Sequence, residues 1–266
     1  MKIGCLPICF FDAIKTKKLT LSAWHQMAAD LGLDGVEVYE PFLESYEKSH
    51  LLRIRKELRG LDLDISMLTT YGNIANTDVN EWQVAVDAIR RSIEVAAIIG
   101  TSNVRIAPGK WRIGSTRDMQ INYVVRALRE LIPFAAKYGV TLAIENHPEV
   151  GVKIDDFLDI LRRVNQAELK VNLDTSNSLL AGDDPVRLAR EVKRHVVHVH
   201  ASDRLRNGTH CAVGEGIVPF PEIFRTLKQA GYDEWISMEV GGTKGEEDIR
   251  RSRDYVRETW EAAPVQ

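Results

Sequence analysis

Short apolar runs alternate with longer amphipathic runs along the whole of this 266-residue chain. The short runs are rich in valine and isoleucine and are flanked by turn-forming residues, a pattern that predicts buried parallel strands. The predicted strands are about Ile3–Leu6, Val36–Tyr39, Ile65–Leu68, Val104–Ala107, Leu142–Glu145, Val171–Asp174, Val196–His200 and Ile236–Glu239.

The longer runs repeat their apolar positions every three or four residues, as a helix does when it covers a sheet with one face. One such run follows each predicted strand, so strand and helix alternate strictly. The predicted helices are about Leu21–Leu31, Glu44–Arg59, Glu81–Ile99, Arg117–Tyr138, Asp155–Val164, Pro185–Lys193, Pro221–Ala230 and Glu246–Trp260.

Residues that favour helix ends support these boundaries. Ser22, Asn80, Thr116 and Asp184 are suited to accept hydrogen bonds from the free N–H groups at a helix start. Glycine closes a helix most easily because it adopts left-handed geometry without steric cost. The glycines that follow a helical pattern are Gly32, Gly60, Gly100, Gly139 and Gly231.

Eight strand–helix units predict an α/β protein with a single (β/α)8 TIM barrel. A doubly wound open sheet is the alternative, but eight even repeats favour a closed barrel. The chain contains no linker or low-complexity stretch, so residues 1–266 are expected to form one domain.

Composition narrows the class of protein. The hydrophobic fraction of 44% and the charged fraction of 27% are those of a globular protein, and the net charge of −3 argues against nucleic acid as a partner. No apolar run reaches the roughly 18 residues that span a membrane. Cys5, Cys9 and Cys211 are odd in number and form no C-x-x-C pair, so a reducing cytoplasm is expected.

Four consecutive strands end in a residue that binds divalent metals: Glu145, Asp174, His200 and Glu239. Because side chains alternate along a strand and the opposite positions are apolar, all four are expected to face the barrel interior at its carboxyl-terminal mouth. Unpaired buried carboxylates would cost several kcal/mol each, which a bound cation or a network of ion pairs would offset. The pattern predicts a metal site, with structural hydrogen bonding as the alternative for any one residue.

The donor set narrows the identity of the ion. Three carboxylates and one imidazole suit Mn²⁺ best, with Mg²⁺ and Co²⁺ close to it and Zn²⁺ still possible. A closed structural zinc site is not expected, because thiolates are absent from the set.

Other polar positions share the inward face. Glu37 and Arg105 are expected there, His147 is a candidate substrate contact, and His198 lies one layer deeper as a core histidine or a partner of a ligand. The loops after the early strands offer aromatic rings that can stack on a sugar. These rings are Phe10, Phe11, Tyr39, Tyr71 and Trp111. Lys110 and Arg112 flank Trp111 and would hold a phosphate or carboxylate unless they form a solvated surface pair.

Several motifs resemble the sugar phosphate isomerase/epimerase superfamily, the xylose isomerase-like TIM barrels. This group includes tagatose and psicose 3-epimerases, hydroxypyruvate isomerases, inosose dehydratases and endonuclease IV. The resemblance covers nearly the whole chain and is strongest after residue 140. The motifs are A-I-E-N-H at 143–147, V-N-L-D-T-S-N at 171–177, H-V-H-A-S-D at 198–203, G-E-G-I-V-P-F at 214–220 and A-G-Y-D-E-W-I-S-M-E at 230–239.

The resemblance implies roles for the four strand ends. In the ketose epimerases this set holds one divalent metal, and the two glutamates, here Glu145 and Glu239, also act as acid and base. An arginine that follows the histidine ligand contacts substrate, and Arg204 and Arg206 are both candidates. Those epimerases commonly carry a histidine three residues after the aspartate, where this chain has Asn177. An asparagine can hydrogen-bond a hydroxyl but cannot take a proton, so the substrate contact there differs.

The expected function is a metal-dependent isomerase or epimerase of a small sugar, keto-sugar or sugar phosphate, working by glutamate proton transfer through a metal-stabilised enediolate. A lyase, such as an inosose or dehydroshikimate dehydratase, is the main alternative, and a barrel with a purely structural ion is another. An endonuclease IV-like enzyme is remote, since it needs three metals and the strands at 65–68 and 104–107 offer no histidine. The expected partner is a small polyhydroxylated substrate, and a homo-oligomer stays open. The substrate-binding candidates are His147, Asn177, Arg204, Arg206 and Trp111.

Overall fold

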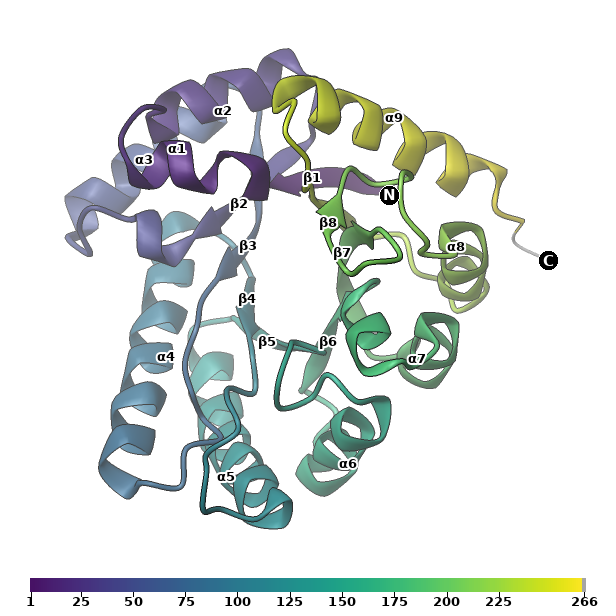
Figure 1. Cartoon of the computed structure of the whole chain (residues 1–266). Helices are drawn as coiled ribbons and strands as arrows, with labels where there is room; N and C mark the ends of the chain where they lie inside the picture. The colour runs from purple at the N-terminus through teal and green to yellow at the C-terminus, as the bar shows by residue number, and fades with distance from the viewer. Residues whose placement is uncertain (265–266) are drawn as a thin grey trace.

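The computed structural model describes residues 1–264 and confirms the TIM barrel. Eight parallel strands surround the centre and the helices lie outside them (Figure 1). The strands follow one another in the order β1-β9-β7-β6-β5-β4-β3-β2. They are β1 (Lys2–Leu6), β2 (Gly35–Tyr39), β3 (Asp64–Thr69), β4 (Asn103–Ile106), β5 (Thr141–Glu145), β6 (Lys170–Asp174), β7 (Val196–Arg204) and β9 (Trp235–Glu239).

The barrel closes between β1 and β2 through a single residue instead of a regular ladder. The backbone N–H of Asp34 donates to the Ile3 carbonyl oxygen at 2.9 Å, and the Asp34 carboxylate accepts from the Ile3 N–H at 2.7 Å. The Asp34 side chain therefore takes the place of a backbone hydrogen bond of the kind that joins the other neighbouring strands.

The structure confirms the eight predicted helices. It adds short helical segments of five or fewer residues, which are too short to show a helical periodicity in the sequence. Figure 1 shows α1 as a brief turn after β1. The helices are α1 (Phe11–Lys15), α2 (Leu21–Asp30), α3 (Lys48–Gly60), α4 (Val79–Ile99), α5 (Arg117–Lys137), α6 (Ile154–Val164), α7 (Pro185–Val192), α8 (Phe220–Gln229) and α9 (Glu246–Ala262), with 3-10 segments at Ile8–Phe10, Glu40–Phe42 and Asn177–Ala181.

Two of the four predicted helix caps are confirmed and two are wrong. Thr116 caps α5 and Asp184 caps α7. Ser22 lies inside α2, which Thr20 caps by accepting from the Ala23 N–H at 3.1 Å. Asn80 lies inside α4, where the Asp78 carboxylate accepts from the next free N–H groups instead. The start of α2 at Leu21 agrees with the predicted start, whereas α4 starts at Val79, two residues earlier than predicted.

One predicted helix stop is also wrong. Gly60 is the last residue of α3, and the left-handed residue that follows is Asp62, with φ 55°. The other four predicted glycines have positive φ, between 66° and 91°. The expectation of a single domain over 1–266 stays a prediction, and its last two residues lie outside the described part.

The outward strand faces build the core, while the inward faces are polar. Leu142, Ile144, Val171 and Leu173 belong to the apolar cluster between sheet and helices. The inward positions of β5, β6 and β7 include buried carboxylates, an amide and two imidazoles: Glu145, Asp174, Asn172, His198 and His200. This distribution leaves the barrel interior as the place where charged chemistry can occur.

One strand was not expected. β7 extends four residues past His200, and a two-residue strand, β8 (His210–Cys211), folds back antiparallel against it. The pair forms a hairpin over the mouth of the barrel. A two-residue strand carries no detectable alternation, so sequence patterning misses it.

Candidate metal-binding active site

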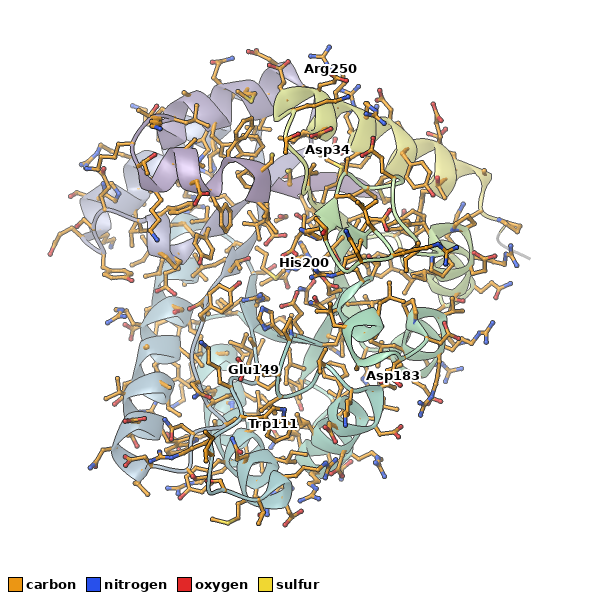
Figure 2. All side chains as sticks on the ribbon, in the orientation of Figure 1. Asp34, Trp111, Glu149, Asp183, His200 and Arg250 are labelled. Atoms are coloured by element: carbon orange, nitrogen blue, oxygen red, sulfur yellow. The ribbon has the colours of Figure 1, made fainter. Side chains whose placement is uncertain are left out.

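The four predicted strand ends come together at the mouth of the barrel. Each of Glu145, Asp174, His200 and Glu239 offers a ligand atom, and these atoms all lie within 4.8 Å of one another. The Nδ1 atom of His200 is 2.8 Å from Glu145 Oε1 and 3.0 Å from Glu239 Oε1. Figure 2 labels His200 near the centre of the barrel. Parallel strands bring their carboxyl ends to one edge, which explains this convergence of residues far apart in the chain.

The electrostatics of the cluster fit a divalent cation. Burial raises the pKa of Asp174 to about 7, together with the negative charges of Glu239 and Glu145. A positive ion among the three carboxylates would offset the cost of burying their negative charges together. The donor set and its charge therefore both suit a metal. The described residues can hold a metal here.

Glu145 is kept ionised by its neighbours. Burial alone would raise its pKa, but Arg105 and His200 outweigh burial and lower it. Arg105 Nη2 lies 2.6 Å from Glu145 Oε2, an ion pair without hydrogen-bond alignment, so this oxygen accepts no hydrogen bond from the described residues. The Asn172 amide donates weakly to the other oxygen at 3.4 Å. An ionised carboxylate with one oxygen that accepts no hydrogen bond is suited to bind a metal or take a proton.

Asp174 is oriented by the turn that follows β6. Its Oδ1 accepts from the backbone N–H groups of Ser176 at 2.8 Å and Asn177 at 2.7 Å, and its Oδ2 accepts from the Ser202 hydroxyl at 2.8 Å. An aspartate readily forms such local hydrogen bonds with the residues after it. The local sequence thus fixes the carboxylate at the end of the strand.

Glu37, on β2, fixes the orientation of the His200 ring. The Nε2 atom of His200 lies 3.0 Å and 3.2 Å from the two Glu37 oxygens, and the Thr69 hydroxyl donates to the same carboxylate. Burial alone would raise the pKa of Glu37, but His200 outweighs it and lowers the pKa to about 2. Although burial opposes it, the charges of Glu37, Glu239 and Glu145 raise the pKa of His200. A metal at Nδ1 would replace the proton there, while the carboxylate at Nε2 would hold the other proton.

A second group of three possible ligands, Glu37, His198 and His200, lies one layer deeper. His198 donates from Nδ1 to the Asn172 Oδ1 at 3.0 Å, and burial lowers its pKa to about 3. It is therefore a neutral, hydrogen-bonded core residue. With one carboxylate against three in the upper group, the upper group is the better cation site.

Aromatic rings form a wall on the other side of the mouth. Ring centroids lie 4.6 Å apart for Phe11 and Tyr39, 5.9 Å for Tyr39 and Tyr71, and 5.6 Å for Tyr71 and His147. Tyr71 is 45% exposed and covers the Arg105 guanidinium, whose Cζ is 4.4 Å from the ring centroid. The predicted Phe10 packs against Trp24 instead of joining this wall. The wall ends at His147, so it reaches the metal side of the pocket.

The structure places Trp111 apart from the cluster. Its backbone N–H donates to the Glu149 carboxylate at 2.9 Å, and Figure 2 shows the two residues together on the α5 side, away from His200. The neighbouring Arg112 is exposed, donates to the Asn76 side chain and lies 4.0 Å from both Asp78 and Glu81.

The structure separates the two candidate arginines. Arg204 Nη2 donates to Asn177 Oδ1 at 3.2 Å and its Nε donates to the Ser176 hydroxyl at 3.1 Å, next to Asp174. Arg206 lies exposed at the tip of the β7–β8 hairpin. Sequence reasoning found no signal at His210, which the hairpin places opposite Arg204. Continuing the alternation past His200 to Ser202 and Arg204 would have extended the inward row.

Comparison with known proteins gives the same architecture. A family model described as xylose isomerase-like TIM barrel matches residues 26–259. The chain is similar to a solved structure described as a D-tagatose 3-epimerase-like protein, with a TM-score of 0.84 and 21% identity, covering 99% of this chain and 98% of that one. At this identity the likeness shows the fold.

Two curated relatives match over most of their length. An uncharacterized protein of Methanocaldococcus jannaschii is 25% identical, covering 97% of this chain and 89% of the relative. An inosose dehydratase of Clostridium beijerinckii is 23% identical, covering 90% of this chain and 89% of the relative. Similar proteins thus carry names of both epimerases and dehydratases. Within residues 1–264, no helix combines the length and apolar character needed to cross a membrane.

Proposed function

The chain belongs to the xylose isomerase-like TIM barrel family, and from this premise we propose that it is a divalent-metal-dependent isomerase or epimerase of a small polyhydroxylated ketone. One observation carries the proposal. Two glutamates from β5 and β9 approach the same histidine nitrogen at 2.8 Å and 3.0 Å, beside a buried aspartate. Such a group can both bind a cation and transfer protons.

Glu145, Asp174, His200 and Glu239 would hold the ion, and Mn²⁺ is the ion we expect first for three carboxylates and one imidazole. When bound there, a divalent metal supplies Lewis-acid stabilisation of negative charge on substrate oxygens. The aromatic wall at Tyr39 and Tyr71 would stack on the apolar side of the substrate.

The two glutamates differ in a way that assigns the proton transfers. Glu145 is buried and held ionised by Arg105, which suits the base that removes a carbon-bound proton. The Glu239 side chain is 12% exposed, so it can exchange protons with solvent and return one to the opposite face of the same carbon. After a forward turnover Glu145 releases its proton to solvent and Glu239 takes one up, so that both regain their starting states. In the reverse reaction the two residues exchange roles.

Hydrogen exchange in D₂O tests this assignment on the metal-loaded protein with a panel of ketoses, observed by NMR. We expect Glu145→Gln to abolish exchange of the α-proton of one epimer, while Glu239→Gln keeps that exchange and slows formation of the other epimer. With the other epimer as substrate the two variants should exchange behaviour. Glu234→Gln is the matched control, because Glu234 is exposed at the opposite end of β9.

The metal content of each variant is measured alongside. Full exchange and full product formation in both variants, with metal bound, would show that these glutamates are not the acid and base. Metal bound without exchange of any ketose would point to a barrel with a structural ion.

A dehydratase is the second candidate, favoured by the dehydratase relative that matches 90% of the chain. The same base would remove the α-proton, and an acid would protonate a β-hydroxyl so that it leaves as water. Product analysis in the exchange experiment distinguishes the two. A dehydrated product instead of an epimer or isomer would replace the first candidate by the second.

A further inference from the structure

The β7–β8 hairpin extends the inward face of the barrel beyond its rim. His198, His200 and Ser202 alternate along β7 toward the interior, and Arg204 is the next residue of that row. Arg204 pairs directly with His210 on β8. Directly opposite residues of an antiparallel pair carry their side chains on the same face. Because Arg204 reaches Ser176 and Asn177 beside the metal ligand Asp174, this shared face is the one toward the cluster.

Arg204 carries a positive charge without a negative partner. Its three hydrogen bonds go to neutral acceptors: the Ser176 hydroxyl at 3.1 Å, the Gly208 carbonyl at 3.1 Å and the Asn177 amide oxygen at 3.2 Å. A guanidinium has five N–H donors, so two remain. Within residues 1–264 no carboxylate lies within 4.0 Å of these nitrogens, unlike Arg105, which pairs with Glu145 at 2.6 Å.

The adjacent Asp203 does not neutralise this charge. Its carboxylate accepts hydrogen bonds from the backbone N–H groups of Arg204 and of three residues in the following loop, and it is 1% exposed. The three loop donors are Gly214 at 2.9 Å, Gly216 at 2.9 Å and Val218 at 3.1 Å. Asp203 therefore anchors that loop on the side of the strand opposite to Arg204.

His210 adds a free ring nitrogen to the same face. Its Nε2 atom is buried and has no hydrogen-bond partner among the described residues. Burial lowers the pKa of His210, with Glu239 and Asp203 opposing the shift and Arg204 adding to it, so the imidazole lies within electrostatic reach of all three. A neutral imidazole can still donate one N–H to an anionic oxygen.

We propose that Arg204 and His210 form a subsite for an anionic oxygen group, a carboxylate or a phosphate, at the end of the substrate that points away from the metal cluster. This inference rests on the proposed function and narrows its substrate class from neutral ketones to anionic ones. The unpaired guanidinium supplies the charge, the buried imidazole supplies a directed donor, and the hairpin holds both on one face.

Small anions test the subsite directly. Acetate and inorganic phosphate are titrated separately into the metal-loaded protein by calorimetry, for wild type, Arg204→Gln, His210→Gln and Arg206→Gln. We expect a saturable site for at least one anion, weakened about tenfold or more by Arg204→Gln or His210→Gln, since a charge-assisted hydrogen bond contributes about 1.5–3 kcal/mol. Arg206→Gln, an exposed arginine two residues away, should leave the affinity unchanged.

The two anions distinguish which anionic group of the substrate the subsite binds. Preference for acetate indicates a substrate carboxylate, and preference for phosphate indicates a phosphate ester. No saturable binding in wild type, or an equal loss in Arg206→Gln, would overturn the subsite. Binding that the first two substitutions leave intact would place the anion on the metal and would also overturn it.

Hydrogen exchange experiments test the anion subsite separately from the proposed function. Matched ketoses with and without a terminal anion are compared in D₂O. Exchange of neutral ketoses with equal KM in wild type and Arg204→Gln would overturn the subsite and leave the proposed function standing. Anion binding that depends on Arg204, without exchange of any substrate, would overturn the proposed function and leave the subsite.

Discussion

The two halves of the barrel mouth are built for different tasks. The strands β5, β6 and β9 end in metal-binding side chains and β7 carries His200, whereas β1 and β4 end in Leu6 and Ile106 and the loops on that side carry aromatic rings. The first half is held by hydrogen bonds and ion pairs between buried charged groups. The second half is held by ring packing between Phe11, Tyr39 and Tyr71. We infer that the first half positions an ion and protons, and that the second shapes the space for substrate.

The largest loss of metal affinity is expected at His200, because this residue belongs to both groups of possible metal ligands. His200→Ala removes a ligand nitrogen and the imidazole that Glu37, Glu145 and Glu239 all contact. We expect metal affinity to fall by more than about 100-fold, since even residues that only orient a ligand are worth about 10–100-fold. Metal titration measures this, with circular dichroism to check the fold. A folded variant with unchanged affinity would contradict the assignment of His200.

A smaller loss of metal affinity is expected when Glu37, which contacts His200 from below, is changed. Glu37→Gln replaces the carboxylate that holds the Nε2 proton of His200. We expect about 10–100-fold weaker metal binding and a changed tautomer of the His200 ring, read from its ¹⁵N shifts. Thr69→Val removes only one donor to Glu37, so it should have a weaker effect in the same direction. An unchanged ring tautomer in Glu37→Gln would show that Glu37 is only a structural partner.

The aromatic half should respond in substrate affinity and leave metal binding intact. Tyr71→Ala removes a ring between Tyr39 and His147. We expect KM to rise by about three- to tenfold, the value of an aromatic contact of about 0.5–1.5 kcal/mol. Tyr71→Phe keeps the ring and should retain most of the affinity. If Tyr71→Ala changed metal affinity as strongly as Glu37→Gln does, the division between the two halves would be wrong.

The smallest effect is expected at the loop after β4. Arg112→Gln removes a charge that is 4.0 Å from Asp78 and Glu81 on the surface. Exposed ion pairs contribute about 0–1 kcal/mol, so stability should change little and KM not at all. Thermal unfolding and steady-state kinetics check both. A large rise in KM would restore this loop as a substrate contact.

The barrel and the residues of the cluster could be predicted because buried parallel strands appear in a sequence as short apolar runs. The alternation within these runs was enough to put Glu145, Asp174, His200 and Glu239 on one face. It could not reveal contacts between distant strands. Glu37 and His200 are 163 residues apart in the chain, and only the closed barrel brings them together.

Short or locally determined features were also out of reach. The cap of α2 is Thr20 and not Ser22, and α1 has only five residues. His210 sits on a two-residue strand whose partner is fixed by a turn, so no periodicity marked it. The choice between Arg204 and Arg206 depended on that same hairpin.

Equilibrium binding of Mn²⁺ tests the central claim most directly, because the claim is that four strand ends hold one divalent ion. Electron paramagnetic resonance counts free and bound Mn²⁺ for wild type and for Asp174→Asn, in which one carboxylate of the cluster becomes an amide. We expect one saturable site in wild type and a loss of affinity of about 100-fold or more in the variant. No saturable site in wild type, or equal affinity in both proteins, would contradict the claim.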